Sequence, residues 1–149
     1  MGPPAARIYM NTRPENWPAL LWSFVQSRQS RPFVWGEHDC CLFAADWVRE
    51  LHGIDPAADF RGAYTSALGA TRIVGHGFSL ATFVGDRFAA LGIEKIPVLS
   101  ASRGDLVAAH VGAYSRLCLG IVVDHRAAFP ASAGLMTISL NQAAHGWKL

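Results

Sequence analysis

Two adjacent cysteines stand where the most regular helix of this sequence is predicted to begin. Cys40 and Cys41 end the stretch Trp-Gly-Glu-His-Asp-Cys-Cys of residues 35–41 and follow Asp39, a residue type that caps helices. A thiol at a helix N-terminus meets unpaired backbone amides and the positive end of the helix dipole, which favour the thiolate. A thiolate in that position can act as a nucleophile.

The same position also suits a small buried residue, because free cysteines are among the most buried residue types. The Asp39 carboxylate also opposes a second negative charge beside it. Helical spacing separates the two thiols, since Cys41 lies about 100° around the helix from Cys40. The apolar stripe comprises Cys40, Phe43, Ala44, Trp47, Val48 and Leu51. Cys40 is therefore the candidate, as a nucleophile or a core residue, and Cys41 is predicted to be a bystander.

A cysteine nucleophile needs an imidazole within hydrogen-bonding reach. Of the six histidines, His110 and His125 come from predicted strands, and either also suits an ordinary turn. The other four are expected too close to the thiol, at the far end of its helix or in solvated segments: His38, His52, His76 and His145. The chain has no C-x-x-C pair or comparable ligand spacing, so we predict no metal and no cofactor.

Helices are predicted first along the chain, and strands afterwards. The expected helices are 16–29 (capped by Asn16), 40–52 (ended by Gly53), 65–74 (capped by Thr65) and 79–91 (capped by Ser79). The expected strands are 103–111, 116–124, 125–130 and 134–140. This order predicts an α+β fold in which the N-terminal helices, including that of Cys40, pack on a C-terminal antiparallel sheet. We expect one domain over residues 1–149, with an extended leader over 1–14.

Composition excludes several classes of protein. With 149 residues, 51% hydrophobic and 16% charged, the chain is expected to be globular. Its net charge of +2 comes from scattered residues, so no nucleic-acid partner is predicted. No apolar run reaches the roughly 18 residues of a membrane span, so no membrane insertion is predicted. Three cysteines, two of them adjacent, indicate reduced thiols.

Several motifs together resemble the NlpC-type cell-wall cysteine peptidases, which have a papain-like fold. These motifs are "FVWGEHDCCLFAADWV" (33–48), "RGDLV" (103–107) and "LGIVVD" (119–124). The chain resembles even more a family of small proteins encoded by tailed phages and prophages. That likeness spans roughly residues 15–149 and includes "FRGAY" (60–64), "AAFPASAGLMTISL" (127–140) and Trp147.

The resemblance implies that Cys40 is the nucleophile of a cleft that acts on peptidoglycan stem peptides. The supporting cleft residues are Trp35, Gly36, His38 and Asp39. The family histidine precedes Val-Gly-Ile on the second strand, and here "CLGIVVD" puts Cys118 at that place. His110, in "HVGAY", is only five residues after Asp105 and is kept as the available base from the adjacent strand.

The third polar position of the family triad falls near "RAAFP", where the chain offers Phe129 and Pro130. The triad is therefore expected to be degenerate. If Cys118 takes the histidine position, its sulfur should lie near that of Cys40. Such a pair would be redox-sensitive or would simply fill an inert cleft, and the inert cleft is the favoured interpretation.

Two functions follow from the resemblance. The favoured one is a structural component of a phage tail tip or baseplate, located in the virion and in contact with other hub proteins. Cys118 and the low charge content support it. The alternative is an active tail-associated cysteine peptidase or amidase, which cleaves peptidoglycan as the phage enters the cell. The intact Trp-Gly-x-His-Asp-Cys stretch supports this alternative.

Overall fold

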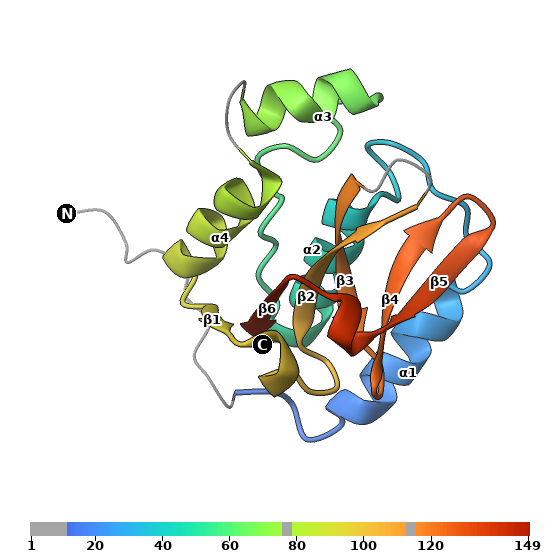
Figure 1. Ribbon diagram of the computed structural model, residues 1–149, viewed down its shortest axis with the longest axis vertical. Helices are drawn as coiled ribbons and strands as arrows, with labels where there is room; N and C mark the ends of the chain where they lie inside the picture. Colours follow the sequence, from blue (N-terminus) through green and yellow to red (C-terminus); the bar gives the residue numbers. More distant parts are fainter. Residues whose placement is uncertain (1–11, 76–78, 113–115) are drawn as a thin grey trace.

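The computed structural model describes residues 12–75, 79–112 and 116–149. In these residues the chain forms four α-helices followed by a six-stranded antiparallel sheet, which confirms the α+β prediction (Figure 1). The helices are α1 (Trp17–Arg28), α2 (Cys40–His52), α3 (Ala67–Val74) and α4 (Leu80–Ala90). The strands are β1 (Glu94–Ile96), β2 (Leu106–Val111), β3 (Arg116–Val122), β4 (Arg126–Ala131), β5 (Gly134–Ser139) and β6 (His145–Lys148). Two short 3-10 helices are η1 (Val98–Ser100) and η2 (Leu140–Gln142).

The sheet has the strand order β1-β6-β2-β3-β4-β5. The four predicted strands correspond to β2 to β5, which pair in sequence as a meander. The sequence did not predict β1 and β6. The last strand, β6, inserts between β1 and β2, so that Trp147 lies opposite Lys95 on one side and Leu106 on the other (Figure 1).

The predicted packing of α2 on the sheet is confirmed. One face of the sheet, with Leu106 and Ile121, forms a core with α1, α2 and α4. At its centre Trp47 is fully buried, and its indole Nε1 donates a hydrogen bond to the Gly104 carbonyl at 2.9 Å. Burying a large apolar side chain contributes about 1.5–3 kcal/mol. Trp47 therefore anchors α2 to the turn before β2.

The helix starts follow local capping. The Asp39 and Ser79 caps are confirmed, since each side chain accepts from the amide three residues on. The predicted Thr65 cap is wrong by one residue, because the Ser66 hydroxyl accepts from Gly69 N at 3.1 Å. Asn16 precedes α1 but makes no side-chain capping bond.

Helix α3 stands apart from the sheet, at the upper edge of the molecule in Figure 1. None of its residues is buried, and the Leu68 side chain is exposed. Helices owe most of their stability to packing of an apolar face. The attachment of α3 is therefore the weakest among the helices.

A buried carboxylate holds both ends of the described chain together. Asp105 accepts hydrogen bonds from Arg13, at 2.7 Å, and from the backbone amide of Leu149, at 3.0 Å. Of the predicted leader, residues 12–14 are described and have no regular structure, while 1–11 lie outside the described residues. Among the residues that the structure describes, no helix is long and apolar enough to cross a bilayer.

Candidate active site

Asp39 organises the start of α2. It has extended backbone angles, and one carboxylate oxygen accepts from Leu42 N at 3.0 Å. The other oxygen accepts from Gly36 N at 3.0 Å and from the Tyr64 hydroxyl at 2.5 Å. The side chain is buried, so these bonds replace the water that an ionised carboxylate would otherwise need. Asp39 thus ties the 35–39 loop, the helix and the 60–64 segment together.

Gly36 allows the loop to approach that segment closely. Its φ of +80° lies in the left-handed region, and a Cβ placed there would be 2.0 Å from the Tyr64 carbonyl oxygen. The neighbouring Trp35 ring packs edge-on against Phe33, with ring centroids 4.8 Å apart, and the Arg116 guanidinium lies 5.7 Å from the Trp35 ring centroid. The loop is therefore fixed before the helix begins.

The three cysteines meet at this end of α2, and all are free thiols. The thiols of Cys118, on β3, and of Cys41 lie beside the Cys40 sulfur, where hydrogen bonds from them and from the amides of Leu119 and Cys41 would stabilise a Cys40 thiolate. These bonds, the one from Cys118 first, hold the pKa of Cys40 well below its ordinary value. The bonds to Cys40 and burial raise the pKa of Cys118 and of Cys41.

Cys118 lies near Cys40, as expected, whereas Cys41 does not point away from the site, as the helical spacing had predicted. Helical spacing turns Cys41 away from the sheet, but the 60–64 segment and α3 cover that side of the helix. Cys41 therefore lines the same cavity as the other two thiols. Among the described residues, no group of three or more potential ligand side chains is arranged to hold a metal ion.

The thiols lie along one wall of a cavity of about 640 Å³. Most of the other lining residues are apolar and come from α3, α4, the 60–64 segment and the facing ends of β2 and β3. The aromatic lining residues are Phe33, Trp35, Phe60, Tyr64 and Phe83. Arg116 brings a positive charge and Asp39 a negative one. Gly36 and His38, which the sequence placed in the cleft, support the loop behind it and do not line the cavity.

His38 is fully enclosed, with 0% of its surface exposed. Neither ring nitrogen hydrogen-bonds to a residue that the structure describes, and the ring packs edge-on against Phe43. Burial, followed by the charges of Arg31 and Arg28, lowers the pKa of His38. His38 is thus a neutral core histidine at the base of the loop.

His110 is exposed on β2 and lines a different cavity, together with Lys95, His145 and Trp147. His125 is exposed at the turn between β3 and β4, and His52 is the last residue of α2. Among the described histidines, none lines the cavity of the thiols. His76 lies outside the described residues.

Cys118, where the resemblance would put the family histidine, lies on β3 opposite Ala109 of β2. Farther along β3, a Cβ on Gly120 would be 2.6 Å from the Phe129 ring, so the chain needs glycine there. Phe129, near which the resemblance would put the third polar residue of the triad, is fully buried. An apolar ring in that position cannot orient a base.

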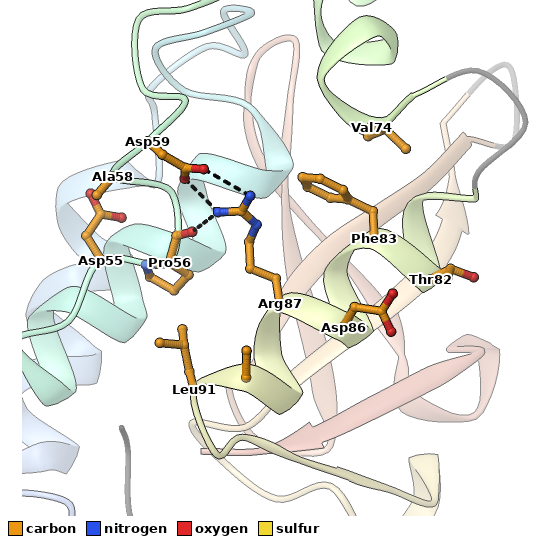
Figure 2. Close-up of a pocket in the computed structure, with 11 residues that line it drawn as sticks. Asp55, Pro56, Ala58, Asp59, Val74, Thr82, Phe83, Asp86, Arg87 and Leu91 are labelled. Atoms are coloured by element: carbon orange, nitrogen blue, oxygen red, sulfur yellow. Dashed lines mark hydrogen bonds and ion pairs between the residues drawn. The ribbon is translucent and has the colours of Figure 1, made fainter. Parts of the chain in front are cut away.

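A second cavity of about 660 Å³ lies between the 55–59 segment and α4 (Figure 2). Its arginine, Arg87, is already neutralised, because the guanidinium donates to Asp59 at 2.6 and 3.1 Å and to the Pro56 carbonyl at 3.2 Å. Its described lining includes no cysteine and no histidine. The thiol cavity is therefore the candidate active site.

The sequence missed two residues of this site, Cys41 and Tyr64. The "FRGAY" stretch pointed to Tyr64 as part of a shared motif, without showing its bond to Asp39.

In comparisons with known proteins, no curated protein matches the chain. A family described as a domain of unknown function (DUF6950) matches residues 12–149. Because this match covers most of the chain, the protein belongs to the DUF6950 family.

Proposed function

We propose that this protein is a structural component of a phage tail tip or baseplate, with a papain-like NlpC-type fold whose peptidase triad is degenerate. The observation that carries the loss of peptidase activity is the thiol of Cys118 beside Cys40, where a peptidase needs an imidazole. The resemblance to small tailed-phage proteins supports the location in the virion and the contact with other hub proteins.

A cysteine cannot replace the histidine of a cysteine peptidase. The base must accept a proton from the nucleophile and return it to the leaving amine near neutral pH. The pKa of Cys118 is raised by its hydrogen bond to Cys40 and by burial, so this thiol stays protonated near neutral pH as long as the Cys40 thiolate is beside it. Cys118 can stabilise a thiolate at Cys40, but it cannot carry the proton through acyl transfer.

The test compares deletion with point substitution in the phage or prophage that encodes the chain. Deletion of the gene should abolish complete tails, seen by electron microscopy of the particles. Cys40→Ala should leave tail assembly and infectivity within about twofold of wild type, with Cys41→Ala as the matched control. Normal tails after deletion would overturn the structural role. Full assembly with infectivity lost only in Cys40→Ala would overturn the loss of catalysis.

The second candidate is an active cysteine peptidase or amidase. The lowered pKa of Cys40, at the N-terminus of α2 and facing a cavity of about 640 Å³, favours it. Backbone amides at the helix start would serve as the oxyanion hole. Incubation of the purified chain with peptidoglycan discriminates between the two candidates. Release of new amino groups by wild type and not by Cys40→Ala would establish the enzyme.

A further inference from the structure

We propose that Cys40 and Cys118 form a reversible intramolecular disulfide, with a low-molecular-weight disulfide such as glutathione disulfide as the oxidant. This redox modification goes beyond the proposed structural role, because it does not depend on where the protein resides. It rests on the arrangement of the three thiols around one cavity.

The geometry selects Cys118 as the partner of Cys40. The two residues come from α2 and β3, which pack together in the core, and their side chains lie beside each other in the lining of the same cavity. A disulfide requires Cβ atoms about 3.5–4.5 Å apart and pointing toward each other. Cys40 and Cys41 are consecutive residues of a helix whose side chains diverge by about 100°, so they do not meet this requirement.

The cavity gives an oxidant access to the thiols. Cys40 is only 6% exposed, but it lines the cavity, and Cys41 and Cys118 beside it are partly exposed. Cys40 is also the member of the cluster that most readily loses its proton, because the neighbouring thiols lower its pKa, whereas the pKa values of Cys41 and Cys118 are raised. The first attack therefore starts from Cys40.

The reaction proceeds by two exchanges at sulfur. In the first, the Cys40 thiolate attacks one sulfur of glutathione disulfide, the S–S bond of the oxidant breaks, and one glutathione thiolate leaves. In the second, Cys118 no longer has the Cys40 thiolate beside it, which was the first cause of its raised pKa, so it loses its proton and its sulfur attacks the Cys40 sulfur of the mixed disulfide. The second glutathione leaves and takes the proton that Cys118 releases. Two protein thiols are oxidised, and one glutathione disulfide is reduced to two glutathione thiols.

The disulfide would fasten the start of α2 to β3 and remove the thiolate from the cavity. The oxidised protein would then be inert toward alkylating agents at Cys40. Cys41 would remain as a free thiol, because its side chain diverges by about 100° from that of Cys40 and cannot approach the Cys40 sulfur as a disulfide requires.

The experiment incubates the full chain with glutathione mixtures from fully reduced to fully oxidised, quenches with acid, and alkylates the remaining thiols. Intact mass and non-reducing peptide mapping then give the products. We expect two of the three thiols to be lost in the oxidised mixtures, with a cross-link between the peptides of residues 40 and 118. Dithiothreitol should restore all three thiols.

Matched variants identify the partners. Cys41→Ser should keep the cross-link, Cys40→Ser should abolish it, and Cys118→Ser should stop at the mixed disulfide on Cys40. Three free thiols at full oxidation, a lasting mixed disulfide in wild type, a Cys41–Cys118 link or intermolecular dimers would each overturn the proposal. The decisive measurement is made on wild type, so it does not depend on how the variants fold.

Discussion

Two buried aspartates, Asp39 and Asp105, are held in opposite ways. Asp105 is 0% exposed and forms salt bridges with Arg13 at 2.7 Å and Lys148 at 3.4 Å. Asp39 is 1% exposed and accepts its hydrogen bonds from uncharged groups, two backbone amides and the Tyr64 hydroxyl. The charge of Asp105 is neutralised and serves stability. The charge of Asp39 acts on the thiols beside it and contributes to the raised pKa of Cys41 and Cys118.

The largest expected effect is on stability at Asp105. Asp105→Ala removes the partner of Arg13 and leaves the amides of Ser102 and Leu149 without their acceptor. Breaking a buried pair in this way costs about 3–5 kcal/mol. Urea unfolding should show this loss in the free energy of unfolding. A loss below about 1 kcal/mol would mean that the two aspartates do not differ as described.

The next largest effects on stability are expected at Gly36 and Gly104, the glycines near the two aspartates. Gly36→Ala brings a Cβ against the Tyr64 carbonyl at a φ of +80° and should destabilise by about 3 kcal/mol. At Gly104 the Cβ would meet the Arg13 guanidinium, at 2.8 Å, and a side chain can shift more readily than the backbone carbonyl that Gly36 faces, so Gly104→Ala should cost about 1–2 kcal/mol. Thermal unfolding of both variants gives the ranking. Equal losses of stability in the two variants would show that the loop at Gly36 can move to accommodate the added Cβ.

Asp39→Asn should act on reactivity more than on stability. Asparagine also caps helices, so the loss should be about 1–2 kcal/mol. Removal of the negative charge should lower the pKa of Cys41 and Cys118. Iodoacetamide labelling between pH 8 and 10, followed by peptide mapping, should then show faster alkylation of both. The matched variant Asp105→Asn should leave these alkylation rates unchanged.

The free energy of unfolding should also depend on pH, because His38 is buried in the loop next to Asp39. Its pKa is lowered in the folded protein, chiefly by burial, so the unfolded chain binds the proton first as pH falls. Stability should therefore decrease as pH falls below about 6.5, by up to about 1.4 kcal/mol per pH unit for one proton. His38→Leu should flatten this slope in urea titrations between pH 7 and 5. A smaller slope should remain from His52 and His145, whose pKa values are also lowered.

The smallest effect is expected at α3, which covers the thiol cavity but buries no residue. Leu68→Ser should change the free energy of unfolding by less than about 0.5 kcal/mol. Hydrogen exchange should be faster in α3 than in α2. Slow exchange throughout α3 would contradict the weak attachment described above.

The sequence allowed good predictions where local rules decide the structure. The Asp39 cap, the apolar stripe of α2 and the antiparallel succession of β2 to β5 all depend on neighbouring segments, and the structure confirms them. The strands β1 and β6 are short, and each depends on a partner distant in sequence. Cys41 was misplaced for a related reason. The helical pattern locates the side that faces the sheet, whereas α3 and the 60–64 segment cover another side of the same helix.

The position of β6 has a consequence for the order of assembly during synthesis. In the described sheet, β1 pairs with β6, and β6 fills the place between β1 and β2. Among the described strands, β6 is synthesised last. Until residues 145–148 leave the ribosome, one edge of β2 has no partner strand and β1 remains unpaired. An open edge offers its amides and carbonyls to any other extended chain. Completion of the sheet is thus a late and long-range event, which makes folding slow relative to its local helices.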